Sequence, residues 1–113
     1  MQIHESLNDR VGMAGDYTRI GLVHCCMRNY KEALGYHGKA RAIDEELNDR
    51  VGMAVDYTDI GNIMLKIGDN KEALKSLYNA LRIFQELEKK TGYHYPRIED
   101  IQGQISYLKQ YDK

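Results

Sequence analysis

Cysteine, proline and tryptophan are scarce in this sequence. Its 113 residues include two cysteines, one proline and no tryptophan. The two cysteines, Cys25 and Cys26, are adjacent, a spacing that suits neither a disulfide framework nor a zinc site of the C-x-x-C kind. Because proline interrupts helices, its near absence leaves the chain free to be largely helical.

The sequence also lacks a surplus of one charge and a long apolar segment. Lys and Arg number 16 against 17 Asp and Glu, so the net charge near −1 offers no basic surface to nucleic acid or an anionic membrane. The longest apolar stretch, residues 22–27, is interrupted by His24 and falls far short of the roughly 18 residues that span a bilayer. The first residues do not resemble a secretory signal. We therefore expect a folded cytoplasmic protein with no nucleic-acid or membrane partner.

What the sequence does contain is an internal repeat. Residues 7–46 and 47–86 align without a gap, and half of the aligned positions are identical. Two unrelated segments of this length and average composition would share only about two or three residues. Residues 7–14 recur unchanged as residues 47–54. The sequence therefore contains a duplicated structural unit with a period of 40 residues.

Each unit is predicted to form two helices. Apolar and small residues of the second unit recur at helical spacing on either side of a break at residues 68–70. Gly68 can adopt the left-handed conformation that ends a helix, and Asp69 or Asn70 can cap the helix that follows. Asp9 and Asp49 are predicted to cap the first helix of each unit. The two stripes are Tyr57, Ile60, Gly61 and Met64, then Ala73, Leu77, Ala80, Leu81 and Phe84.

The pattern of these residues is similar to that of a known repeat. In the second unit it comprises Tyr57, Ile60, Gly61, Met64, Gly68, Ala73, Leu77 and Ala80, and in the first a weaker set of Tyr17, Ile20, Gly21, His24, Ala33, His37 and Ala40. This pattern resembles the tetratricopeptide repeat over nearly the whole chain. The 40-residue period and the E-L-N-D-R joint at residues 46–50 are similar to a longer-repeat subclass found in kinesin light chains and related scaffolds.

The resemblance implies an all-α fold. Antiparallel helix hairpins would stack as a right-handed solenoid, with the first helix of each hairpin lining a concave groove. Residues 96–111 carry an apolar stripe with Pro96 in the first turn, and Gln102 stands at the position of Gly61. Because that small residue is missing, no partner helix can pack closely behind, and we expect a capping helix. Its stripe consists of Ile98, Ile101, Ile105 and Leu108.

The opening residues suggest how the array begins. Residues 2–6 fall in the register of residues 42–46, so we expect residues 1–6 to be the end of a preceding repeat. The chain is then a fragment of a longer array, which we favour, or has lost its upstream repeats. An uncovered first hairpin predicts self-association through that end. The predicted organisation is one array, with residues 7–46 and 47–86 as two repeats and residues 87–113 as the cap.

The resemblance also implies which residues line the groove. In this family, an Asn directly after the Gly often bonds the backbone of a bound peptide, which makes Asn62 the leading candidate; the alternative is a solvated helix residue. Chaperone-tail binders carry Lys, Asn and Arg where Thr18, Leu22 and Thr58 stand here, which disfavours a chaperone adaptor. The groove candidates are Gly15, Thr18, Leu22 and Cys25, then Val55, Thr58, Asn62 and Leu65, and Glu99 on the capping helix.

His24, Cys25 and Cys26 invite a metal or nucleophile interpretation. Successive side chains on a helix point about 100° apart, so these three cannot converge on one ion. We expect no metal, cofactor or catalytic residue. His24 and His37 replace the packing residues Met64 and Leu77. We expect both to be partly buried with their hydrogen bonds satisfied, and neutral. The acidic run at residues 44–46 is expected to be solvated.

The predicted function is a non-catalytic interaction scaffold. It would hold a peptide or helical segment of another protein in the concave groove. One alternative is a regulatory or sensory repeat fragment of a larger signalling or transcription protein. Another is a metal- or thiol-dependent activity at His24, Cys25 and Cys26. No constellation of acid, base and nucleophile supports the latter.

Overall fold

The structure is a computed structural model that describes residues 7–110. Residues 1–6, to which the expected end of a preceding repeat was assigned, lie outside the described residues. Over the described range the chain is all-α, as predicted. Its five helices are α1 (Leu7–Cys26), α2 (Tyr30–Glu46), α3 (Arg50–Ile67), α4 (Asn70–Thr91) and α5 (Arg97–Gln110).

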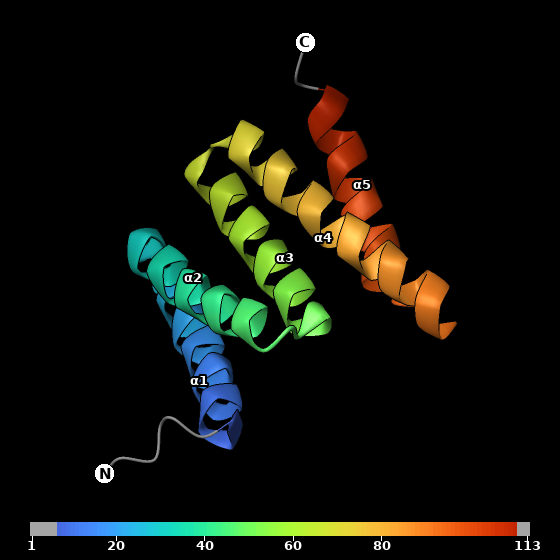
Figure 1. The fold of residues 1–113 in the computed structure, drawn as a ribbon. Helices are drawn as coiled ribbons and strands as arrows, with labels where there is room; N and C mark the ends of the chain where they lie inside the picture. Colours follow the sequence, from blue (N-terminus) through green and yellow to red (C-terminus); the bar gives the residue numbers. More distant parts are fainter. Residues whose placement is uncertain (1–6, 111–113) are drawn as a thin grey trace.

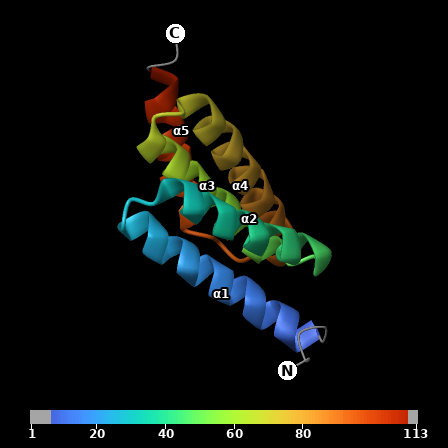
Figure 2. The same ribbon diagram turned by 90° about the vertical axis from the view of Figure 1, so that its left-hand side faces the viewer.

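The helices stack in chain order. α1 and α2 form one antiparallel hairpin and α3 and α4 a second (Figure 1). The hairpins meet where α2 packs on α3, and α5 packs on α4. α1 and α5 therefore lie at opposite ends of the stack in both views (Figure 2). This is the solenoid of helix hairpins with a C-terminal capping helix that the sequence predicted.

Helix boundaries follow the local chemistry of the joints. The side chain of Asp49 accepts a hydrogen bond from the Gly52 N–H at 3.0 Å, and Asp69 accepts one from the Glu72 N–H at 3.1 Å. Gly68 ends α3 in the left-handed region, with φ of 97°. These predictions are confirmed, but the one for Asp9 is wrong. Because α1 begins at Leu7, Asp9 lies inside the first turn, where its charge still favours the helix dipole.

Glycine lets the two helices of each hairpin approach closely. A Cβ atom built on Gly61 would lie 3.0 Å from the Leu77 side chain. One built on Gly21 would lie 2.8 Å from Nε2 of His37, the residue that replaces Leu77 in the first hairpin. Any larger residue at either glycine would force the helices apart.

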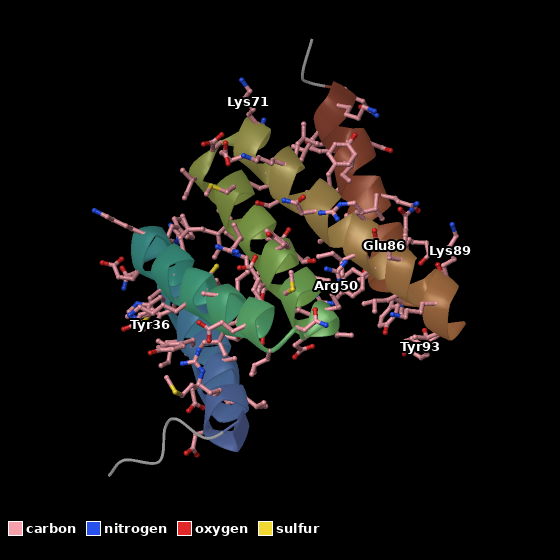
Figure 3. The ribbon with its side chains drawn as sticks, viewed as in Figure 1. Tyr36, Arg50, Lys71, Glu86, Lys89 and Tyr93 are labelled. Carbon is pink, nitrogen blue, oxygen red and sulfur yellow. The ribbon has the colours of Figure 1, made fainter. Side chains whose placement is uncertain are left out.

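An ion pair recurs once in each hairpin. Arg10 pairs with Glu46 across the first hairpin, and Arg50 pairs with Glu86 across the second at 2.7 Å (Figure 3). All four residues belong to positions that are identical in the two units. Exposed pairs of this kind contribute about 0–1 kcal/mol each, so their main effect is to fix the register of the hairpin ends.

The capping helix buries its predicted stripe. Ile98, Ile101, Ile105 and Leu108 are all buried against the second hairpin. Tyr95 lies in the loop between α4 and α5, and its ring packs on that of Phe84 with the ring centroids 5.2 Å apart. The last hairpin is therefore covered by side chains from both the α4–α5 loop and α5.

The turn inside the first hairpin contains a strained residue. Arg28 has φ of 66° and occupies the repeat position at which the second unit has Gly68. A left-handed conformation costs a residue with a side chain about 1–2 kcal/mol. Glycine removes this cost, but the gain is smaller because glycine also makes the unfolded chain more flexible. We therefore expect Arg28→Gly to raise the free energy of unfolding by about 0.5–1 kcal/mol in urea denaturation. Gly68→Arg is the matched control and should lower it. Equal stability of Arg28→Gly and the parent protein would contradict this account.

Candidate functional site

Three clefts open along the first helices of the stack. The α1–α3 cleft, of about 380 Å³, lies between the two hairpins, and the α3–α5 cleft, of about 500 Å³, lies between the second hairpin and the cap. The end cleft, of about 750 Å³, opens near the α3–α4 turn. The α1–α3 cleft is lined by Val11, Ala14, Gly15, Thr18, Arg19, Asp44, Asp49, Gly52, Val55 and Asp56. The α3–α5 cleft is lined by Thr58, Asn62, Arg97, Asp100, Ile101 and Gln104.

Six of the nine groove candidates line these clefts. Gly15 and Thr18 on α1 and Val55 on α3 line the α1–α3 cleft. Thr58 and Asn62 line the α3–α5 cleft, although Thr58 is buried and donates its hydroxyl to the Ala54 carbonyl at 2.8 Å. Leu65 lines the end cleft. The remaining candidates, Leu22, Cys25 and Glu99, line none of the three.

Glu99 is engaged at the α4–α5 junction instead. One of its carboxylate oxygens lies 3.1 Å from Nε2 of His94, whose Nδ1 lies 2.6 Å from Glu88. The hydrogen bond to Glu88, with support from Glu99, raises the pKa of His94. Asp100, the next residue along α5, lines the α3–α5 cleft in place of Glu99, because successive side chains on a helix point about 100° apart.

Asn62 already bonds another helix. Its side-chain oxygen accepts a hydrogen bond from Nε2 of Gln104 at 2.7 Å, which joins α3 to α5. Asn62 also lines the α3–α5 cleft. Sequence reasoning missed Gln104 because only the packing of α5 brings these residues together.

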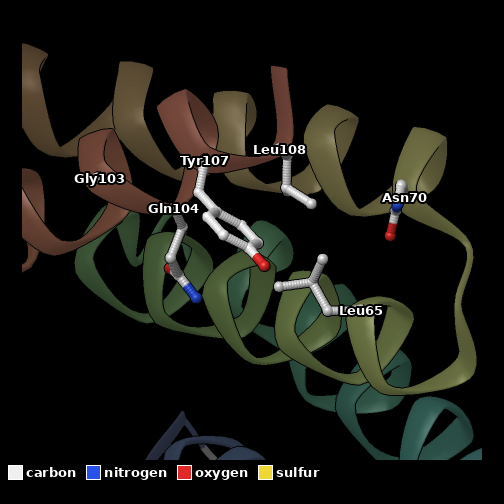
Figure 4. A pocket seen from close by; sticks show the side chains of 6 residues that line it. All are labelled: Leu65, Asn70, Gly103, Gln104, Tyr107 and Leu108. Atoms are coloured by element: carbon white, nitrogen blue, oxygen red, sulfur yellow. The ribbon is translucent and has the colours of Figure 1, made fainter. Parts of the chain in front are cut away.

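The end cleft is lined by apolar groups of α3 and α5. The Tyr107 ring extends from α5 towards Leu65 on α3, and Gln104 points the same way (Figure 4). Leu108 forms part of the lining from the buried side of α5. This cleft suits an apolar side chain of a bound segment.

The α1–α3 cleft contains a buried pair of carboxyl groups. Asp44 on α2 and Asp56 on α3 are 6% and 1% exposed. The carboxyl groups of Asp44 and Asp56 are hydrogen-bonded to each other, and the Thr18 hydroxyl lies 3.5 Å from Oδ1 of Asp56. Gly52 makes room for the pair, because a Cβ there would lie 2.6 Å from Oδ2 of Asp44.

Sequence reasoning missed this pair and expected Asp44 to be solvated. One signal was available, since the second unit has Phe84 at the position of Asp44, and Phe84 belongs to the predicted apolar stripe. An aspartate at a core position of a repeat is therefore a polar group placed where the fold will bury it. Its partner on the next helix could not be read from spacing alone.

Burial decides the protonation of the pair. Loss of water, then the hydrogen bond and negative charge of Asp44, raise the pKa of Asp56 to about 9. Burial also raises the pKa of Asp44. Two carboxyl groups this close cannot both ionise readily, so the pair retains one proton at neutral pH.

His37 is fully buried beneath Gly21, as the close approach of the helices requires. Burial lowers its pKa, and the nearby Asp59 only partly opposes this. The expectation that its hydrogen bonds are satisfied is wrong, because neither ring nitrogen has a partner among residues 7–110. Its Nδ1 lies 3.8 Å from Oδ2 of Asp59, beyond hydrogen-bond distance.

The other histidine of the first hairpin is only partly buried. His24 stacks on Tyr36 with ring centroids 5.3 Å apart, and its Nδ1 lies 3.4 Å from the Asn29 amide. Cys25 and Cys26 are free thiols. Within the described part of the chain, no three His, Cys, Asp or Glu side chains come together in a group that could hold a metal ion.

Comparison with known proteins agrees with this architecture. The family model for the tetratricopeptide repeat matches residues 14–86, well over half of the chain. The chain therefore belongs to the tetratricopeptide-repeat family, whose members generally mediate protein–protein interactions. No curated protein gives a significant match. Among the five helices of residues 7–110, none combines the length and the apolar character needed to cross a membrane.

The buried groups predict two opposing effects of pH on stability. The folded protein keeps a proton on Asp56 up to its pKa of about 9, whereas the unfolded chain loses this proton above about pH 4. The free energy of unfolding therefore falls as pH rises between these two values, by up to about 1.4 kcal/mol per pH unit. Asp44 and Asp59, whose pKa values are also raised, act in the same direction. His37 acts oppositely below about pH 6.5, where only its unfolded form is protonated.

The variant Asp56→Asn separates these effects. Its melting temperature should fall less steeply than that of the parent between about pH 6.5 and 9, while the loss in acid due to His37 remains. Asp16→Asn, a change of the exposed residue at the equivalent position of the first unit, should keep the parent profile. Parallel melting curves of parent and Asp56→Asn over this range would show that Asp56 is not protonated in the folded protein.

Proposed function

We propose that this protein is a non-catalytic scaffold that holds a segment of another protein in the groove formed by α1, α3 and α5. The observation that carries the proposal is the row of three clefts along these helices, which together present apolar walls and unpaired polar groups. An extended or helical segment needs this combination, since side-chain pockets give specificity and backbone contacts give affinity.

The α3–α5 cleft supplies the backbone contact. Asn62 lines it, and its amide N–H groups would donate to a peptide carbonyl while Gln104 holds the side-chain oxygen. Leu65 and Tyr107 in the end cleft would contact an apolar side chain of the same segment. Exposed Leu22 and half-buried Cys25 extend the surface along α1 beyond the clefts.

The thiols favour a reducing compartment. Cys25 and Cys26 are both free, as is usual for cytoplasmic proteins, and we place the scaffold in the cytoplasm. A regulatory repeat unit of a larger signalling protein would use the same groove and is compatible with this proposal. A thiol- or metal-dependent activity at these residues would require one hyper-reactive thiol in a thiol titration, or a stoichiometric amount of bound metal in a metal analysis.

The clamp at Asn62 can be tested with peptides selected from a random library for binding to the parent protein. We expect Asn62→Ala to weaken the best peptide by about 1–2 kcal/mol, roughly tenfold in dissociation constant, because a peptide carbonyl loses its donor. Gln104→Ala is the matched control. It breaks the same bond between α3 and α5 but leaves the Asn62 amide, so it should weaken binding clearly less than Asn62→Ala does.

Two results would contradict the proposal. Equal weakening by Asn62→Ala and Gln104→Ala would mean that Asn62 serves only to hold α5. Selected peptides whose binding survives substitutions in all three clefts would place the interaction on another surface. Calorimetric titration of each variant with one synthetic peptide distinguishes these results.

We also propose self-association through the outer face of α1. Ile20 and Val23 are exposed there, and exposed Met27 follows directly after the helix. Val23 is 56% exposed, whereas Ile63, at the equivalent position of the second hairpin, is only 2% exposed within the stack of helices. The uncovered face therefore matches the surface of another hairpin of this kind, which a second copy of the chain can provide.

Light scattering over a range of concentrations tests this association. We expect the mass to rise towards that of a dimer, and Val23→Glu to restore the monomer because it buries a charge in the interface. Val11→Glu is the matched control, since Val11 is equally exposed on α1 but lines the α1–α3 cleft. A monomer mass at every concentration would rule the association out.

A further inference from the structure

The outer face of α4 carries a row of positively charged side chains. Six exposed residues recur along the helix at alternating steps of four and three, the spacing that places side chains on one helix face. At about 100° per residue they fall within about 80° of the helix circumference, on the side opposite the buried residues of α4. We call this row the α4 stripe, and it consists of Lys71, Lys75, Tyr78, Arg82, Gln85 and Lys89.

The four cations of the α4 stripe are not neutralised within the fold. Among residues 7–110, no ion pair joins Lys71, Lys75 or Lys89 to an acid. Arg82 donates to the side-chain oxygen of Asn79 at 3.3 Å, which leaves its charge in place. Figure 3 shows Lys71 and Lys89 extending away from the ribbon near the two ends of α4. The stripe therefore presents four positive charges to the solvent.

The acids beside the second half of the stripe are bonded elsewhere. A shallow hollow of about 560 Å³ lies there, lined by Arg82, Gln85, Glu86, Glu88 and Lys89. Glu86 pairs with Arg50 at 2.7 Å, and Glu88 pairs with His94 at 2.6 Å. The charges that the hollow leaves for a partner are therefore positive.

The stacking of the hairpins does not require this stripe. Its five positions within the repeat are occupied in the first unit by Lys31, Gly35, Gly38, Ala42 and Glu45. Only one of these is basic, although half of all aligned positions are identical in the two units. In addition, like charges four residues apart, as at Lys71 and Lys75, destabilise a helix. The stripe therefore does not serve the stability of the fold.

We propose that the α4 stripe is a docking surface for an acidic segment of a partner protein that carries an apolar side chain near its middle. Carboxylates of the segment would pair with the four cations, and its apolar side chain would contact the exposed ring of Tyr78. From Lys71 to Lys89 the stripe is about 27 Å long, which about eight extended residues can span. The stripe lies outside the groove of α1, α3 and α5, so this inference does not rest on the proposed function.

The acids on either side of the stripe favour a narrow partner. On the helix circumference, Glu72 and Glu86 flank it on one side and Glu88 on the other. An anionic membrane or a nucleic-acid duplex is wide enough to bring its own negative charges against these acids, which opposes binding. A single peptide segment can cover the cations alone. Because exposed ion pairs are weak and screened by salt, we expect the affinity to depend on ionic strength.

The test is a nuclear magnetic resonance titration of the full chain with a synthetic peptide of about ten glutamates that has one leucine at its centre. We expect amide shifts at Lys75, Tyr78 and Arg82, and an affinity that falls at least several-fold between about 50 and 200 mM salt. Replacing the central leucine by glutamate should weaken binding to the parent protein several-fold. It should have little effect on binding to Tyr78→Ala, which lacks the ring that the leucine contacts.

Charge reversal within the stripe should weaken binding most. The double variant Lys75→Glu with Arg82→Glu should raise the dissociation constant at least about fivefold, because two attractive pairs become repulsive. The pair Lys71→Gln with Lys89→Gln provides the same test if the first variant folds poorly.

A second double variant controls for net charge. Lys66→Glu with Lys109→Glu makes the same change at exposed residues of α3 and α5, outside the stripe, and should bind close to the parent. Equal weakening by the two charge-reversed variants, shifts confined to other helices or an affinity independent of salt would overturn the proposal. Tighter binding of phosphatidylserine vesicles or of a DNA duplex than of the peptide would overturn it as well.

Discussion

The whole structure depends on burying one apolar face of each hairpin against the next hairpin. A pair of helices as short as these cannot bury enough surface alone, so stability comes from stacking. Within each hairpin the approach is set by Gly21 and Gly61, which admit the side chains of His37 and Leu77. Between hairpins the contact is made by α2 and α3, and beyond the second hairpin α5 packs against α4.

The two hairpins satisfy this constraint with different chemistry. The second uses Leu77 and Phe84 in a fully apolar core. The first places His37 and Asp44 at the same positions, so its core and its junction with α3 are polar. These substitutions place ionisable groups in the core of the first hairpin and, at Asp44, in the lining of the α1–α3 cleft.

Polar groups in the groove act together with the packing around them. Asn62, which lines one cleft, is held by its bond to Gln104, and Asp56, which lines the next, is held by its hydrogen bond to Asp44. Each side chain is therefore oriented before a partner arrives, which reduces the entropy lost on binding. The stacked helices thus provide a row of fixed polar contacts with apolar walls between them.

The sequence by itself determined the repeat, the helices and the cap. A 40-residue duplication, helical spacing and the glycine and aspartate residues at the joints are local signals, and they correctly predicted the stripe of Ile98, Ile101, Ile105 and Leu108. Only the tertiary structure decided the environment of Asp44 and Asp56, the bond between Asn62 and Gln104, and the place of Glu99. Periodicity reports which side of a helix is apolar, whereas pKa values and cleft linings depend on which neighbour packs against it and how much water it excludes.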